Sequence, residues 1–205
     1  MAPLAAAEQL FGHVGFKSAR LSALPRWVNV LEKIEQEQDI YTACERSADA
    51  CPSRVVEDWR RFIVKMRGKS QLEQLEKVNL YANKWRYIED RKLWQKSDYW
   101  ASPLEFISHS GDCEDYSIFK YITLKHLGFT EDQLRMVVVR DTVRNIAHAV
   151  LSVRVADKTY IMDNLFNRVL EDKQMLQYKP YYSVNANARW TYVPTLANNR
   201  RFTRR

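Results

Sequence analysis

The sequence predicts an α+β fold, with helices in the first half of the chain and antiparallel strands in the second. Three observations support this prediction. Apolar residues recur at helical spacing from Pro25 to Trp85. The segment between Gly111 and Gly128 is apolar on nearly all sides, which is typical of a buried helix. Beyond Gly128 the apolar spacing changes to two residues, which is typical of strands.

Capping and stop signals divide the helical half. The segment from Leu4 to Phe11 is predicted as a short helix that ends at glycines. Pro25 opens a longer helix, because proline is favoured in the first helical turn. Ser53 and Ser70 can each cap a further helix, since a serine side chain accepts a hydrogen bond from the first turn. The first half of the chain is therefore expected to be helical.

An aromatic, turn-rich segment from Tyr87 to Ser110 separates this half from the rest of the chain. Its aromatic side chains either line a substrate groove or pack beneath a long loop, and the sequence leaves both alternatives open. Ser102-Pro103 is predicted to start a short helix within it. Strands are predicted over residues 134–140, 148–155, 159–163 and 190–193. The tyrosine cluster at 178–182 has no assignment.

Composition indicates a globular chain without a membrane span. Hydrophobic residues make up 46% and aromatic residues 12% of the 205 positions, which suffices for a buried core. No apolar run approaches the length of a membrane span. We expect one domain over residues 1–205, with a mainly helical lobe at 1–90, the Cys113 helix packed on an antiparallel sheet at 91–195, and a basic tail at 196–205.

The net charge of +7 permits an anionic partner, but lysines and arginines are interleaved with acids along the chain. The basic segment 198–205 is interpreted as a solvated tail and not as an arm that binds nucleic acid. We therefore expect no nucleic-acid partner.

The three cysteines indicate the compartment. Six residues separate Cys44 from Cys51, a loop short enough to close with a disulfide. Cys113 would then be the odd, free thiol, which in an exported protein is a candidate reactive group. In the cytosol all three cysteines would remain reduced.

Cys113 lies at the start of the predicted buried helix. The positive end of the helix dipole favours the thiolate there, and the thiolate is the form that attacks carbonyl groups. The alternative is an inert buried cysteine at a helix start where acidic residues are common anyway.

His148 and Asp163 are the candidate partners of Cys113. His148 begins one predicted strand and Asp163 ends the next. A histidine can take the thiol proton and return one to a leaving amine, while an aspartate fixes the imidazole tautomer. Each residue alone is also explained as an ordinary strand histidine or strand-end aspartate. The other three histidines, in loop or exposed-helix settings, are not favoured as the base: His13, His109 and His126.

The register between these two strands decides whether His148 and Asp163 meet. Alternation puts His148 on a face with Val150, and Asp163 on a face with Ile161. A four-residue loop from Arg154 to Asp157 would set them opposite each other, whereas a tighter turn at Asp157-Lys158 would separate them by about 13 Å. Both alternatives remain open from sequence.

These residues resemble a known family, the bacterial transglutaminase-like cysteine proteinases, and within it the LapG type of periplasmic adhesin-cleaving protease. The resemblance covers roughly residues 79–167, and one departure is a short interval from His148 to Asp163. It rests on four segments in order: Asp98-Tyr99-Trp100-Ala101-Ser102-Pro103-Leu104-Glu105-Phe106, Gly111-Asp112-Cys113-Glu114-Asp115-Tyr116 with Lys120-Tyr121, His148-Ala149-Val150-Leu151, and Asp163-Asn164-Leu165.

The resemblance implies a papain-like or transglutaminase-like α+β fold and a single cysteine-protease domain. It also implies roles for three residues: Cys113 as the nucleophile, His148 as the base and Asp163 as the carboxylate that orients the imidazole. The residue that joins the Cys113 backbone N–H in stabilising an oxyanion is not implied, and Trp85 and Trp100 are the only candidates that we name.

The resemblance further implies a calcium cofactor, with Asp112 and Glu114 at the family's metal site and Asp115 as a third ligand. Independently, three carboxylates within four residues are hard oxygen ligands suited to Ca²⁺, although the spacing is not that of an EF-hand. The alternative is that these are acids that favour a helix start.

The function implied by the resemblance is a periplasmic protease that cuts a large surface adhesin near its N-terminus and so controls biofilm release. An inner-membrane receptor for cyclic-di-GMP would sequester the protease. Two alternatives remain open: a transglutaminase or amide-acyl transferase on the same fold, and a binding module with a degenerate site.

Overall fold

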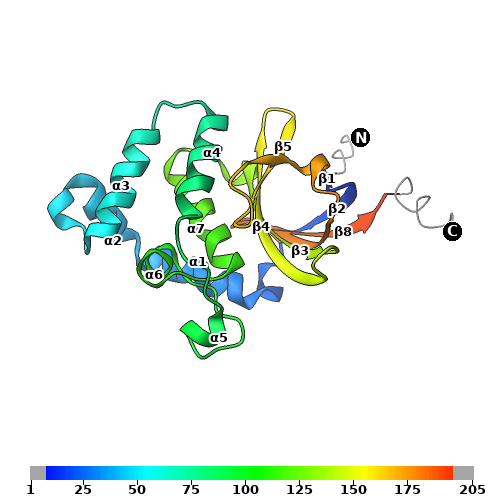
Figure 1. The fold of residues 1–205 in the computed structure, drawn as a ribbon, viewed down its shortest axis with the longest axis horizontal. Helices are drawn as coiled ribbons and strands as arrows, with labels where there is room; N and C mark the ends of the chain where they lie inside the picture. The colour runs from blue at the N-terminus through cyan, green and yellow to red at the C-terminus, as the bar shows by residue number, and fades with distance from the viewer. Residues whose placement is uncertain (1–7, 196–205) are drawn as a thin grey trace.

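The computed structural model describes residues 8–195, in which the helices pack on one side of a large antiparallel sheet (Figure 1). This is the α+β architecture that the sequence predicts. The α-helices are α1 (Pro25–Gln36), α2 (Gln38–Arg46), α3 (Arg54–Met66), α4 (Gln71–Ala82), α5 (Asp90–Leu93), α6 (Pro103–His109) and α7 (Cys113–His126). Short 3₁₀ turns lie at Leu21–Ala23, Ala48–Ala50, Glu131–Gln133 and Asp172–Gln174.

The described strands form one sheet in the order β1-β2-β8-β7-β3-β4-β5-β6, and neighbouring strands are antiparallel. The sheet curls so that its two edges meet. A hydrogen bond joins them, from the N–H of Phe11, which follows β1, to Oδ2 of Asp172, which follows β6, at 3.1 Å. The strands are β1 (Glu8–Leu10), β2 (His13–Ser18), β3 (Leu134–Asp141), β4 (Ile146–Val155), β5 (Lys158–Met162), β6 (Leu170–Glu171), β7 (Tyr178–Val184) and β8 (Arg189–Pro194).

The capping signals in the sequence mark the helix starts correctly. The Ser53 side chain accepts from the Val56 N–H at the start of α3, and the Ser70 side chain accepts from Glu73 at the start of α4. Ser102 forms a reciprocal capping box with Glu105 at the start of α6. Hydrogen bonds between residues three apart decide these ends, which is why the sequence predicts them.

The predicted helix over Leu4–Phe11 is wrong for its described part. Residues 8–10 form β1, and Phe11 and Gly12 are a two-residue hairpin loop with φ values of 50° and 72°. Two consecutive positive φ angles belong to the tight hairpin turn and not to a helix end. Strand β2 of this hairpin also pairs with β8, which comes from the other end of the chain, so the sequence gives no local signal for the β2–β8 pairing. The predicted basic tail at 196–205 lies outside the described residues.

Helix α7 is the centre of the fold and lies between the outer helices and the sheet (Figure 1). Its residues from Asp115 to Leu124 are buried on all sides, as the sequence predicts. The apolar core between the helices and the sheet surrounds this segment, with Trp27, Trp59 and Phe106 among its largest members. The fold therefore fixes the first turn of α7, where Cys113 lies, against a rigid core.

Strand β4 does not alternate between buried and exposed residues, contrary to the sequence prediction. Every residue from His148 to Val153 is buried. Leu151 and Val153 face the core around α7, while Val150 belongs to a second apolar cluster with Tyr178 inside the curl of the sheet. Because both faces are covered, the pattern of period two is lost.

The β4–β5 hairpin adopts neither of the two registers considered from sequence. Val155 pairs with Lys158, so the loop is the two residues Ala156-Asp157, with a φ of 52° at Ala156. Continued past Met162, this register sets Asp163 diagonally across from His148 on the same face. Diagonal neighbours in a sheet are within reach of long side chains.

The structure contains the predicted disulfide between Cys44 and Cys51, and Cys113 is the free cysteine. Among the described residues, none of the helices combines the length and the apolar character that a membrane crossing requires.

Candidate active site

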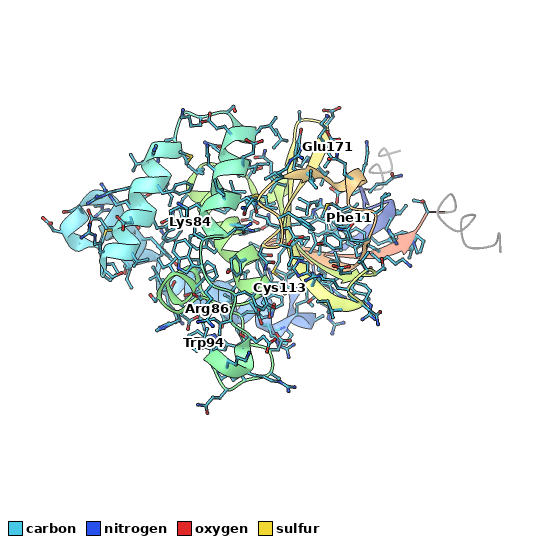
Figure 2. The ribbon with its side chains drawn as sticks, viewed as in Figure 1. Phe11, Lys84, Arg86, Trp94, Cys113 and Glu171 are labelled. Atoms are coloured by element: carbon cyan, nitrogen blue, oxygen red, sulfur yellow. A yellow bond between two sulfur atoms is a disulfide. The ribbon has the colours of Figure 1, made fainter. Side chains whose placement is uncertain are left out.

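Cys113 is the first residue of α7 and lies where the helical layer meets the sheet (Figure 2). Its thiol donates to Glu114 Oε2 at 3.2 Å, and the Ala149 N–H of β4 points to the sulfur. Ala149 follows His148 directly. The structure therefore brings Cys113 to the part of β4 that carries His148.

His148 and Asp163 lie in direct contact, which the sequence leaves open. His148 Nε2 and Asp163 Oδ1 are 2.9 Å apart, and both side chains are almost completely buried. The Leu165 N–H also donates to Oδ1, at 2.9 Å. The Tyr178 hydroxyl donates to the other oxygen, Oδ2, at 2.5 Å. Both oxygens of this carboxylate are thus hydrogen-bonded.

These contacts stabilise the charged form of Asp163. Burial alone raises the pKa of a carboxyl group, but the hydrogen bond and charge of His148, together with the donors Tyr178 and Leu165, hold the pKa of Asp163 below its usual value. A carboxylate that remains ionised can hold the Nε2–H tautomer of the imidazole. The other ring nitrogen, Nδ1, is then free to accept a proton.

The Cys113 thiol lies in the opposite electrostatic environment. Burial raises its pKa, and the nearby carboxylates of Glu114 and Asp112 raise it further, while the Ala149 N–H lowers it. The helix dipole alone does not decide the state of this thiol, contrary to the simplest expectation from its place in the sequence. Neutralisation of the neighbouring acids would favour the thiolate.

Five carboxylates, which we call the acidic cluster, lie beside Cys113. Three are the predicted metal ligands Asp112, Glu114 and Asp115, and two were missed from sequence, Asp90 and Asp98. The ligand atoms of Asp90, Asp98 and Glu114 all lie within 4.8 Å of one another, and so do those of Asp90, Asp112 and Asp115. The structure therefore places the predicted acids in one site with Asp90, the first residue of α5, and Asp98, which follows α5.

The acidic cluster has the chemistry of a site for a hard cation. Asp90 Oδ1 and Asp112 Oδ1 are buried and have no hydrogen-bond partner among the described residues. Burial raises the pKa of Asp112 to about 9, and the adjacent Glu114 and Asp90 act in the same direction. Arg26, which pairs with Asp98 at 3.1 Å, is the cation that contacts the cluster in the described chain. Unpaired buried carboxylate oxygens fit a calcium ion.

Asp115 also has a structural role within the acidic cluster. Its Oδ1 accepts from the Ala101 N–H at 2.7 Å, and its Oδ2 accepts from the Asp112 N–H at 3.1 Å. It therefore ties the loop before α6 to the start of α7. Gly111 makes this possible, because a Cβ at that position would lie 2.1 Å from Asp115 Oδ2.

A buried lysine lies beneath this region. Lys120 is 1% exposed and is two helical turns beyond Cys113 on α7. Burial lowers the pKa of Lys120 to about 7, opposed by the charge of Asp163. Burial of an ammonium group lowers the stability of the fold, so apolar packing alone does not explain why a lysine occupies this position.

Sequence reasoning missed Asp90, Asp98, Tyr178 and Lys120 as members of the site. Asp98 and Lys120 lie in segments that support the family resemblance, and that was the available signal. Tyr178 belongs to the tyrosine cluster that had no assignment.

Neither indole named as an oxyanion donor is free. The Trp85 indole donates to the Ile107 carbonyl at 3.1 Å, and the Trp100 indole donates to Asp98 at 2.9 Å. Both bonds anchor loops around the start of α7. The second oxyanion donor is therefore another group.

Comparison with known proteins gives a consistent result. The family described as bacterial transglutaminase-like cysteine proteinase matches residues 31–197. A search of curated proteins gave no match.

The chain is also similar to solved structures of LapG from Legionella pneumophila. The calcium-bound LapG is 37% identical, with a TM-score of 0.63, and the match covers 67% of this chain and 78% of that one. A second LapG structure is 34% identical, with a TM-score of 0.64, and covers 74% of this chain and 87% of that one. An EGTA-treated LapG has the same identity, TM-score and coverage of this chain, and 84% of that chain is covered.

The family match spans most of the chain, and it includes the acidic cluster, Cys113, His148 and Asp163. The solved relatives share the arrangement of a helical layer on an antiparallel sheet at more than 30% identity. The chain belongs to the bacterial transglutaminase-like cysteine proteinases.

Proposed function

We propose that this protein is a calcium-dependent cysteine endopeptidase that uses Cys113, His148 and Asp163. The observation that carries the proposal is the buried hydrogen bond between His148 Nε2 and Asp163 Oδ1. The residue after His148 in β4 is Ala149, whose N–H points to the Cys113 sulfur. A cysteine protease needs this order of groups, because the carboxylate orients the base and the base serves the nucleophile.

In the first half-reaction, Cys113 Sγ attacks the carbonyl carbon of the scissile peptide while His148 Nδ1 takes the thiol proton. The carbonyl oxygen becomes an oxyanion, and the Cys113 backbone N–H at the helix start can donate to it. The carbonyl then reforms, the C–N bond breaks, and the leaving amine takes the proton from His148. The product is a thioester with Cys113.

In the second half-reaction, His148 takes a proton from water as the water oxygen attacks the thioester carbon. The C–S bond breaks, the acid product leaves, and the proton returns to Cys113. Asp163 stays ionised throughout and stabilises the imidazolium that forms in both halves.

The acidic cluster is the proposed calcium site, with Asp90, Asp98, Asp112 and Glu114 as direct ligands and Asp115 as a ligand or as their anchor. A bound calcium ion supplies positive charge that neutralises the cluster and ties the loop around α5 to the start of α7. The unpaired oxygens of Asp90 and Asp112 support this assignment. Two of the similar LapG structures are a calcium-bound and an EGTA-treated form, which supports a calcium site in this chain as well.

For the substrate, we propose a large surface adhesin that is cut near its N-terminus in the periplasm, which releases the adhesin and the biofilm it supports. An inner-membrane receptor that binds cyclic-di-GMP would sequester the protease. The similarity to LapG supports this proposal, and the Cys44–Cys51 disulfide fits an oxidising compartment.

The test is incubation of the protein with an N-terminal adhesin fragment, with calcium or with EGTA, and with or without a primary amine. We expect two fragments in calcium, none in EGTA, and none with Cys113→Ala. Transfer of the amine to the fragment without cleavage would assign the protein to the acyltransferases instead. Binding without any covalent change would indicate a degenerate site.

The proposed partner can be tested in the same assay. We expect the periplasmic domain of the receptor, when its cytoplasmic part holds cyclic-di-GMP, to bind the protein and suppress cleavage. Cleavage at the same rate in the presence of excess receptor and cyclic-di-GMP would contradict the sequestration proposal and leave the protease assignment intact.

A further inference from the structure

Tyr178 is the first residue of β7, and its ring position is fixed by packing. The residue is 1% exposed and pairs with Asp141 of β3. Its ring lies edge-on to Phe11 at 5.7 Å and beside the His148 ring at 5.9 Å. Figure 2 shows Phe11 among the strands, on the side away from the outer helices, and Phe11 and Tyr178 belong to the same buried apolar cluster. The hydroxyl of Tyr178 is thus held in one place by rigid neighbours.

The Tyr178 hydroxyl donates to Asp163, and the carboxylate in the neighbouring turn does not compete for this hydrogen bond. The nearest alternative carboxylate is Asp141, whose Oδ1 accepts from the Val143 and Arg144 N–H groups. Its Oδ2 accepts from Arg144 Nε at 2.7 Å. Asp141 is therefore satisfied by its own turn, and the Tyr178 hydroxyl donates to Asp163 Oδ2 at 2.5 Å.

The two oxygens of Asp163 have different partners. Oδ1 accepts from His148 and from the Leu165 N–H, while Oδ2 accepts from Tyr178. The terminal torsion of an aspartate is broad and roughly two-fold, so bonds to one oxygen leave the plane of the carboxylate poorly fixed. The bond from Tyr178 to the second oxygen fixes that plane, and so it fixes the direction in which Oδ1 faces His148.

We propose that Tyr178 is a positioning residue for Asp163 and, through it, for His148. The inference rests on the proposed function, because it assigns Tyr178 to the orientation of the same Cys113–His148–Asp163 site. Tyr178 does not touch the substrate. Its hydroxyl keeps the Nε2–H tautomer of His148 and thereby leaves Nδ1 free to serve the thiol.

The first test is Tyr178→Phe, which keeps the ring and removes the hydroxyl. The matched control is Tyr121→Phe, since the Tyr121 hydroxyl also donates to a carboxylate, Glu131, but lies about 12 Å along α7 from Cys113. In cleavage of the adhesin fragment in calcium, we expect Tyr178→Phe to lower kcat about 10- to 100-fold with little change in KM. Tyr121→Phe should leave both constants unchanged.

A spectroscopic readout makes the test independent of the substrate. The chain has 4 histidines, so imidazole proton–nitrogen spectra are simple, and His148→Ala identifies the His148 signals. We expect a protected Nε2–H signal from His148 in the wild type. In Tyr178→Phe this proton should exchange with solvent at least about tenfold faster, because the bond to Asp163 is loosened. Tyr121→Phe should not alter it.

A double-variant cycle identifies the route of the effect. If Tyr178 acts through Asp163, adding Tyr178→Phe to Asp163→Asn should lower the residual kcat by less than about twofold. A full 10- to 100-fold further loss would show that Tyr178 acts elsewhere and would overturn the proposal. Identical His148 spectra in Tyr178→Phe and the wild type would overturn it as well. Failure of the proposed function looks different, because cleavage would then be absent in the wild type or would persist in Cys113→Ala, whereas the His148 spectra would still report on Tyr178.

Discussion

The site contains two sets of carboxylates, Asp163 and the acidic cluster, and they differ in what completes them. Asp163 has a hydrogen-bond donor on each oxygen, an imidazole as its partner, and a pKa below the usual value. The acidic cluster has two buried oxygens without partners among the described residues, and the pKa of Asp112 is raised to about 9. The protein completes the hydrogen bonding of Asp163 with its own groups. The acidic cluster is the proposed calcium site.

This difference separates orientation from assembly. The Asp163 side sets the direction and tautomer of His148 and depends on β4, β5 and β7, which are held in one sheet. The acidic cluster joins the loop around α5 to the start of α7, through Asp90 and Asp115. Substitutions on the Asp163 side should therefore resist rescue by calcium, whereas those in the acidic cluster should respond to it.

The largest expected effect is on the Asp163 side. Asp163→Asn should lower kcat about 10³- to 10⁴-fold, because the amide holds the wrong tautomer of His148. Cys113→Ala and His148→Ala should abolish cleavage. The measurement is cleavage of the adhesin fragment over a range of calcium concentrations, together with calcium affinity by titration calorimetry. Calcium affinity should stay unchanged in Asp163→Asn; recovery of its activity at high calcium would break the comparison.

The next effect concerns the acidic cluster. Asp112→Asn should weaken calcium binding about 10- to 100-fold, since it removes one charged ligand and leaves the others in place. At low calcium its cleavage should be far below that of the wild type, and at saturating calcium it should recover in large part. Glu35→Gln, in an exposed and remote part of α1, is the control for loss of one negative charge. Equal calcium affinity in Asp112→Asn and Glu35→Gln would remove Asp112 from the site.

A third prediction tests the tie between the loop and α7. Gly111→Ala should lower the free energy of unfolding by about 1 to 3 kcal/mol, because its Cβ would overlap with Asp115 Oδ2. Calcium affinity should fall with it. In an Asp115→Ala background the same substitution should cost less, since Asp115 Oδ2 and Cγ are gone and only the Cβ of residue 115, at 2.7 Å, remains in the way. Equal costs in both backgrounds, measured by urea unfolding, would show that the contact does not matter.

The smallest effect on cleavage should come from the buried lysine, because its substitution changes the stability of the fold. Below pH 7 the wild type pays the full cost of a buried Lys120, because the unfolded chain stays protonated up to its pKa of 10.5 while the native pKa is about 7. Lys120→Met should therefore stabilise the fold by on the order of 1 to 4 kcal/mol at pH 7. The gain should shrink as the pH rises from 7 towards 10.5. Chemical unfolding at several pH values measures it, and a less stable variant at pH 7 would contradict it.

Local sequence signals determined most of the helix starts and the types of residue at the site. Ser53, Ser70 and Ser102 mark helix starts through bonds to residues three positions away, and the all-round apolar pattern after Cys113 marks α7 as buried. Strand alternation put His148 on a face with Val150 and Asp163 on a face with Ile161, and it left open whether these two faces coincide. Such signals depend on neighbours within one or two turns, so they are present in the sequence alone.

Only the tertiary structure decided which distant groups meet. The two-residue loop at Ala156-Asp157 set the register between His148 and Asp163, and packing of the loop around α5 against α7 brought Asp90 to Asp112. The pairing of β7 with β3 brought Tyr178 to Asp163. These contacts join segments far apart in sequence, and their geometry follows from strand register and core packing, for which a single sequence has no local pattern.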